Sequence, residues 1–188
     1  MIHSIFAIEL CLPLDTAVHA RLRSLVVDHP EKSGYQDKWQ LYRQAAETML
    51  ANIGHLERGC WDYFDDNSKA LRDYDMWVEG MTTEEGARLE PSGGSDPYRG
   101  GIRYMTLTMA FLLVHDSPTD LAISSLCNIP EADLWKRSTF ERILGGMGAL
   151  SFASVKSDVI YVIPGDDAWG LTVDDLAEPK FEYLRTVV

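Results

Sequence analysis

Alternating apolar and polar residues near the N-terminus predict a first β-strand over residues 4–12. The apolar members that share one face are Phe6, Ile8, Leu10 and Leu12. Glu9 falls on the other face, and a period of two is typical of a strand with one buried and one solvated side. Pro13 ends this strand, and Asp15 is placed to cap a helix that reaches to about residue 27.

The longest helical pattern runs from about residue 36 to residue 64. Apolar residues recur there at helical spacing: Trp39, Tyr42, Ala46, Met49, Leu50, Ile53, Leu56, Cys60 and Phe64. Such a stripe predicts one long amphipathic helix that packs on a sheet. Gly54 and Gly59 would bend this helix, since a glycine costs about 1 kcal/mol relative to alanine in a helix interior.

The C-terminal half alternates strand and helix patterns. Residues 102–115 predict a central strand that becomes covered on both faces towards its end. Residues 138–150 carry a helical stripe, and residues 159–163 predict a third strand. We expect these two strands to pair in parallel through a right-handed crossover. Residues 117–136 support no assignment.

Together these patterns predict an α+β fold with the order β-α-α-β-α-β-α. A small mixed sheet of three or more strands packs against the helices. The 188 residues are interpreted as a single domain. Residues 90–101 contain four glycines and two prolines, which sustain neither helix nor sheet, so we expect a mobile loop there.

The net charge is −12, and it is concentrated in two stretches. Residues 57–90 hold ten Asp or Glu against four Lys or Arg, and residues 158–182 hold seven against one, so each stretch carries −6. A surface of this sign repels nucleic acid and anionic lipid. The acid either keeps the protein soluble or attracts a basic partner, and the sequence leaves open whether the two stretches meet in space.

The three cysteines, Cys11, Cys60 and Cys127, are far apart and form no C-x-x-C pattern. Their number and spacing argue against a disulfide framework or a zinc knuckle, and they favour small core residues in a reducing compartment. No run of about 18 apolar residues predicts a membrane span, and no basic leader precedes the first strand. We therefore expect a cytoplasmic protein.

Residues 162–176, VIPGDDAWGLTVDDL, contain four aspartates and raise the question of a carboxylate site. Thr172 and Asp175 have the capping-box spacing of a helix start, and Asp166 and Asp167 suit the turn that precedes it. The spacing of a calcium-binding loop is missing. We therefore interpret these acids as architectural and predict no metal site.

Trp169 is not explained by this turn. A tryptophan that follows Asp166 and Asp167 either folds onto the domain or anchors a protein partner. These three residues are the candidates for partner binding.

His115 and Asp116, at the end of the strand predicted over residues 102–115, are the catalytic candidates. A histidine beside an acid suits a general base, but no Ser or Cys nucleophile motif accompanies them, so we prefer to interpret them as solvated strand-end residues. The glycines at 145, 146 and 148 lack G-x-G-x-x-G spacing and lie at a helix end. We therefore predict no cofactor.

Three segments of the C-terminal half, RYMTLTMAFLL, TFERILGGMGALSFASVKSDVIYVIP and LTVDDL, together resemble the DUF1517 family of cyanobacteria, chloroplasts and some other bacteria. The residues in step with the family pattern are Tyr104, Thr106, Thr108, Leu144, Gly145, Leu150, Pro164, Leu171, Thr172, Asp174, Asp175 and Leu176. The helical segment QAAETMLANIGHLE is similar more loosely, and VIP stands where the family has WTP. The family offers no catalytic residues to carry over, and the resemblance implies an interaction or regulatory domain.

We therefore predict a soluble interaction or regulatory module rather than an enzyme. It would self-associate and would use its acidic surface to meet a protein partner, with a basic partner favoured by charge. The competing class is a small enzyme or ligand-binding domain with a pocket near His115, Asp116 and residues 90–101.

Overall fold

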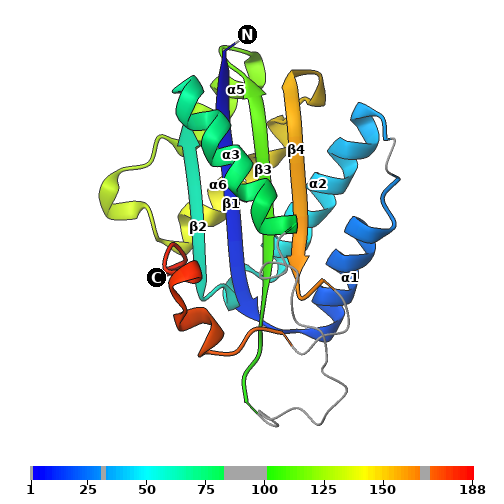
Figure 1. The fold of residues 1–188 in the computed structure, drawn as a ribbon, viewed down its shortest axis with the longest axis vertical. Helices are drawn as coiled ribbons and strands as arrows, with labels where there is room; N and C mark the ends of the chain where they lie inside the picture. Colours follow the sequence, from blue (N-terminus) through cyan, green and yellow to red (C-terminus); the bar gives the residue numbers. More distant parts are fainter. Residues whose placement is uncertain (1, 31–32, 83–100, 166–169) are drawn as a thin grey trace.

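The computed structural model describes residues 2–30, 33–82, 101–165 and 170–188. In these ranges five strands form one antiparallel sheet in the order β4-β3-β1-β2-β5, with helices on both faces (Figure 1). The strands are β1 (His3–Pro13), β2 (Arg58–Phe64), β3 (Tyr104–Val114), β4 (Val155–Ile163) and β5 (Arg185–Thr186). The helices are α1 (Thr16–Val27), α2 (Tyr35–Ala51), α3 (Asn67–Thr82), α5 (Pro118–Cys127) and α6 (Arg137–Gly146). The predicted α+β class is confirmed.

The larger core lies between one face of the sheet and the helices α1, α2, α5 and α6, which lie behind the sheet in Figure 1. The stripe Phe6, Ile8, Leu10 and Leu12, predicted from alternation, is buried here. Tyr42 of α2 packs against Phe111 of β3, with ring centroids 4.6 Å apart. Burial of each such large side chain stabilises the fold by about 1.5–3 kcal/mol.

The second face of the sheet is covered by α3 and by the C-terminal segment, which we define as residues 170–188. Ala70 and Tyr74 of α3 pack on Ile5 and Ala7 of β1. The C-terminal segment places four apolar side chains over Cys11 and Cys60, namely Leu171, Leu176, Phe181 and Leu184. Both faces of β1 are therefore buried, and the predicted solvated side of this strand is wrong.

The helix predicted over residues 36–64 is too long. Helix α2 ends at Ala51, a short 3-10 turn follows at Ile53–His55, and β2 occupies Arg58–Phe64. Cys60 and Phe64 therefore belong to a strand. Gly59 is the second residue of β2, pairs with Leu10 of β1, and does not bend a helix.

The parallel pairing predicted for residues 102–163 is also wrong, because β3 and β4 run antiparallel. The segment that supported no assignment contains α5, so two helices connect the strands. The chain travels along α5 and returns along α6, and β4 therefore begins near the end of the sheet where β3 finishes (Figure 1). The sheet is antiparallel throughout rather than mixed.

Two predicted caps are confirmed. Asp15 accepts hydrogen bonds from the backbone N–H groups of Ala17 and Val18 at the start of α1. The Thr172 hydroxyl accepts from the backbone N–H of Asp175, whose carboxylate accepts from the backbone N–H of Thr172. The element that follows is a short 3-10 turn, Asp175–Ala177, where a helix was expected.

The loop predicted at residues 90–101 lies, apart from Gly101, outside the described residues. All three cysteines are free thiols, with Cys11 and Cys60 buried and Cys127 half-buried. Across the described ranges, no helix combines the length and the hydropathy that a bilayer crossing requires.

Candidate functional site

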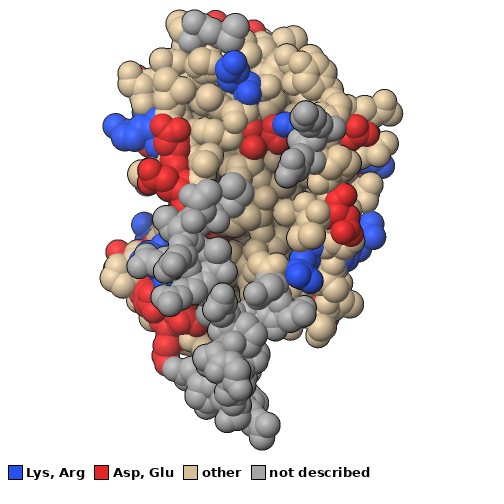
Figure 2. Space-filling model, turned by 45° about the vertical axis from the view of Figure 1, so that its right-hand side comes forward, with Lys and Arg blue, Asp and Glu red and all other residues tan. Residues whose placement is uncertain are grey.

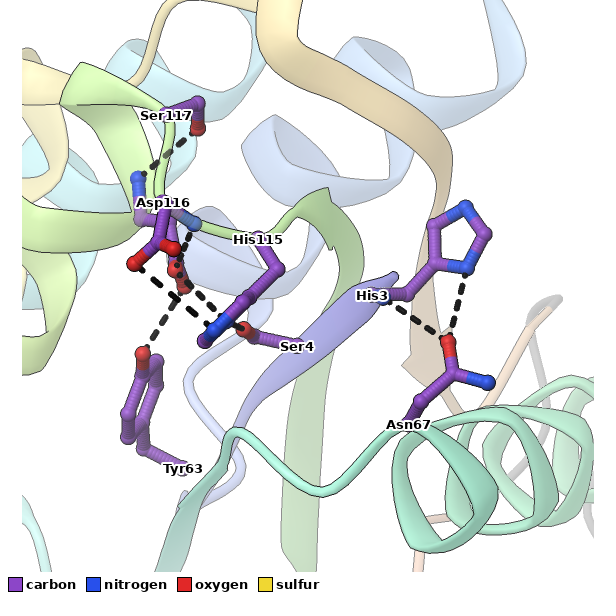
Figure 3. A network of polar contacts seen from close by, with 8 residues as sticks. His3, Ser4, Tyr63, Asn67, His115, Asp116 and Ser117 are labelled. Carbon is purple, nitrogen blue, oxygen red and sulfur yellow. Dashed lines mark hydrogen bonds and ion pairs between the residues drawn. The ribbon is translucent and has the colours of Figure 1, made fainter. Parts of the chain in front are cut away.

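His115 follows the last residue of β3 and lies in a polar network that joins β1, β2 and α5 (Figure 3). Its Nδ1 is 2.9 Å from the hydroxyl of Ser4 and 3.3 Å from Oδ2 of Asp120. Its Nε2 is 3.6 Å from Oδ1 of Asp116. The structure therefore brings the two catalytic candidates together and adds Asp120, which the sequence interpretation missed.

Asp120 is the centre of this network. Its side chain is 2% exposed. The Tyr63 hydroxyl donates to its Oδ1 at 2.8 Å, and the backbone N–H of Asp116 donates to its Oδ2 at 2.8 Å. Burial, together with the bond to Asp120, raises the pKa of Tyr63 to about 12, so that the phenol remains a donor at neutral pH. Two donors and an imidazole nitrogen thus converge on one buried carboxyl group, so that both of its oxygens have partners.

The sequence around Asp120 explains its position. Ser117 is the N-cap of α5, Pro118 is its first residue, and the Ser117 hydroxyl accepts from the backbone N–H of Asp120. The preceding residue, Asp116, has a φ of 59°, a left-handed conformation that aspartate tolerates better than most residues. The pattern S-P-x-D after a strand was the signal that could have identified Asp120 as a cap with a second role.

The arrangement does not form a serine-hydrolase triad. In such a triad the serine and the aspartate lie on opposite ring nitrogens of the histidine, but here Ser4 and Asp120 both contact Nδ1. Ser4 is also fully buried. A carboxylate beside Nδ1 favours the Nδ1–H tautomer, which leaves Nε2 as the nitrogen able to accept a proton.

Within the described ranges, His115, Asp116 and Asp120 form a group whose possible ligand atoms lie within 4.8 Å of one another, close enough to hold a metal ion. The oxygens of Asp120 already accept bonds from Tyr63 and from the backbone of Asp116. Asp120 would have to share its oxygens between these donors and an ion, and the three residues are one ligand short of the four that a structural zinc site uses.

The candidates for partner binding, Asp166, Asp167 and Trp169, lie outside the described residues. The flanking His19 and Arg23 of α1 bond to backbone oxygens just before them: His19 Nε2 contacts the carbonyl oxygen of Pro164 at 2.7 Å, and Arg23 donates to that of Gly165 at 2.9 Å. Helix α1 therefore holds the chain at the end of β4.

A second polar cluster lies on the other face of the sheet, around Glu9. Cys60, Glu9, Thr108 and Tyr161 are directly opposite one another on four adjacent strands. Glu9 is 1% exposed, and the Tyr183 hydroxyl of the C-terminal segment donates to its Oε2 at 2.9 Å. Among the described residues, no partner lies at hydrogen-bond distance from its Oε1 or from the buried hydroxyls of Thr106 and Thr108, although these hydroxyls are close enough to lower the pKa of Glu9.

Burial dominates the electrostatics of this second cluster. It raises the pKa of Glu9 to about 7 from an ordinary value of 4.5, against the opposing effect of the Tyr183 hydroxyl. Burial also raises the pKa of Cys11 and of Cys60 to about 12, so these thiols stay protonated. The sequence interpretation missed this cluster because alternation alone placed Glu9 on a solvated face.

Acidic residues from both stretches lie close to one aromatic contact on this side of the molecule. Trp77 of α3 contacts Tyr183 edge-on, with ring centroids 5.8 Å apart. Asp73 lies one helical turn before Trp77 and is an electrostatic neighbour of Asp62 on β2. Glu182, next to Tyr183, is exposed. We name Asp62, Asp73, Trp77, Glu182 and Tyr183 the acidic–aromatic surface.

Compared with protein-family models, curated proteins and solved structures, the chain shows no significant match. The resemblance to the DUF1517 family therefore stays a prediction.

Proposed function

We propose that this protein is a regulatory interaction module that binds a basic segment of a protein partner at the acidic–aromatic surface. The observation that carries this proposal is the contact between Trp77 and Tyr183. It joins α3, from the first acidic stretch, to the C-terminal segment, from the second. Acidic residues from both stretches therefore lie near this contact, namely Asp62 and Asp73 from residues 57–90 and Glu182 from residues 158–182. In the view of Figure 2, acidic side chains lie along the left side of the molecule with basic ones among them, and others lie on the right.

The electrostatics of Asp62 favour a cationic partner. Burial raises the pKa of this carboxyl, and the negative charge of Asp73 raises it further, while Lys69 opposes both effects. A Lys or Arg side chain supplied from outside would stabilise the ionised carboxyl and relieve its repulsion with Asp73. The neighbouring aromatic rings offer the faces on which an Arg or Lys side chain packs.

The geometry supports an enzyme less well. His115 Nε2 is placed to accept a proton. However, the hydroxyl of the buried Ser4 contacts Nδ1 rather than Nε2. Asp120 contacts His115 and accepts a bond from Tyr63, so it links α5 to the ends of β2 and β3. The network is better explained as a junction between elements than as a reaction centre.

A titration with a short oligolysine peptide, followed by tryptophan fluorescence, tests the proposed function. We expect saturable binding at about 0.05 M salt that is largely lost at about 0.5 M, since exposed charges are screened there. The substitution Glu182→Lys should weaken the affinity about fivefold, because it replaces an attraction with a repulsion.

The matched control is Glu141→Lys on α6, which makes the same change in net charge on the opposite face of the sheet. Equal weakening by both substitutions would mean that oligolysine responds only to net charge. That result, or binding unchanged by salt, would overturn the proposal.

A further inference from the structure

Glu9 is a buried carboxyl group that forms no ion pair with any basic side chain in the part of the chain that the structure describes. The groups that face it are Cys11 on its own strand, Cys60 on β2, Thr106 and Thr108 on β3, Tyr161 on β4 and Tyr183 on the C-terminal segment. Arg58 and Arg185 act electrostatically on the two thiols but are not among the groups that stabilise the Glu9 carboxylate. On α3, Trp77 contacts Tyr183, and the charged residue one helical turn earlier, Asp73, is acidic rather than basic.

A carboxylate without a basic partner in such a site becomes tolerable in two ways. It takes up a proton, or water enters and solvates it. In the neutral form, Glu9 needs only the hydrogen bond from Tyr183 and the neighbouring threonine hydroxyls. In the ionised form, Oε1 has no donor at hydrogen-bond distance among the described residues, and the nearby hydroxyls of Thr106 and Thr108 offset the cost of burial only in part.

The C-terminal segment has less regular secondary structure than α3, the other element that covers this face. It consists of the 3-10 turns Asp175–Ala177 and Pro179–Phe181 and the two-residue strand β5, which pairs with Arg58 and Gly59 of β2. By contrast, α3 is a helix of 16 residues. Local opening concentrates in segments with few backbone hydrogen bonds of their own.

We propose that Glu9 is a proton-binding site that controls the docking of the C-terminal segment. With its proton bound, Glu9 is neutral and compatible with the buried site beneath the docked segment, whereas the ionised carboxylate carries a burial cost larger than the stabilisation that the Tyr183 hydroxyl gives it. Loss of the proton admits water beneath Tyr183 and loosens the segment, and with it the contact between Tyr183 and Trp77. The consequence for partner binding rests on the proposed function, but the switch itself does not.

Nuclear magnetic resonance of labelled glutamate carboxyl carbons and leucine methyl groups tests this switch without a partner. Between about pH 5 and about pH 9, the Glu9 carboxyl should titrate well above the ordinary glutamate range. The methyl signals of Leu176 and Leu184 should shift with the same midpoint. Both methyl titrations should vanish in Glu9→Gln and persist in Glu141→Gln.

A second variant separates the switch from a merely structural role. The Tyr183 hydroxyl stabilises the ionised carboxylate, so Tyr183→Phe should move the Glu9 midpoint to higher pH. A Glu9 midpoint in the ordinary pH range of glutamate would overturn the proposal. Methyl signals of Leu176 and Leu184 that do not change with the same midpoint as Glu9 would also overturn it. A Glu9 midpoint that falls when K⁺, Na⁺ or Mg²⁺ is added would show a cation site in place of a proton site.

These outcomes are independent of the oligolysine experiment. Coupled titration without peptide binding would contradict the proposed function alone, and peptide binding without coupled titration would contradict the switch alone.

Discussion

At the scale of single residues, two buried carboxylates illustrate opposite solutions to the same problem. Asp120 receives hydrogen bonds from a phenol and a backbone N–H and contacts an imidazole, whereas Glu9 receives one bond and leaves an oxygen unpartnered. Satisfied carboxylates stabilise a fold, and unsatisfied ones remain sensitive to pH. This difference is why we assign a structural role to Asp120 and a titrating role to Glu9.

The structural role of Asp120 predicts the effect of Asp120→Asn. The amide keeps the shape of the side chain but replaces an acceptor oxygen with a donor that faces the Tyr63 hydroxyl or the Asp116 N–H. We expect the free energy of unfolding, measured with urea, to fall by about 1–3 kcal/mol.

The matched control is Asp116→Asn at the exposed end of the same network, where the change should stay within about 0.5 kcal/mol. Equal losses at the two positions would show that the network does not converge on Asp120.

At the scale of elements, the errors of the sequence interpretation have a common cause. Leu56, Cys60 and Phe64 are four residues apart, and four is close to a helical turn and is also a multiple of the strand period. The stripe therefore fitted β2 as well as a helix. The strands β1, β3 and β4 were recoverable because continuous alternation or apolar runs of that length fit no helix.

The packing of α6 on β2 provides a prediction at this scale. Gly59 is buried, and a Cβ added there would lie 2.6 Å from Cε1 of Phe140 on α6. Gly59→Ala should therefore push the helix from the sheet and lower the free energy of unfolding by about 1–3 kcal/mol. Thermal unfolding followed by circular dichroism measures this loss.

Gly145→Ala, within α6 itself, is the control. A Cβ at Gly145 meets nothing within 4 Å, so alanine should raise the stability by up to about 1 kcal/mol through its higher helix propensity. Opposite signs at the two glycines would confirm that contact with β2, rather than helix propensity, fixes the position of α6. A stabilising Gly59→Ala would contradict it.

At the scale of the whole molecule, the sequence predicted the positions of candidate polar site residues better than it predicted which residues are buried. His115 and Asp116 were found because a strand end exposes polar residues in a local pattern. The burial of Glu9 was not found, because α3 and the C-terminal segment cover it, and the contact with Tyr183 spans 174 residues of sequence. The pattern of apolar and polar residues within 4–12 carries no information about distant segments that cover this face of the strand.

This burial predicts how the stability of the whole chain depends on pH. The pKa of Glu9 is about 7 in the folded protein against an ordinary value of 4.5, so the folded state holds the proton more tightly than the unfolded state does. The contribution is therefore fully present below the unfolded pKa and is lost as the pH rises towards 7. From about pH 5 to about pH 8, the free energy of unfolding should fall by about 2–3 kcal/mol on account of Glu9.

Glu9→Gln removes this contribution, so we compare how steeply the free energy of unfolding falls with pH in the variant and in the wild type. Denaturant unfolding of both at several pH values isolates the effect of Glu9 from that of the other acids, which the two chains share. We expect the variant to lose less stability than the wild type over this interval and to overtake it at the alkaline end if the amide finds the partners that the neutral acid had. Parallel pH profiles would mean that the carboxyl group is solvated in the folded protein, and the switch proposed for the C-terminal segment would then have no driving force.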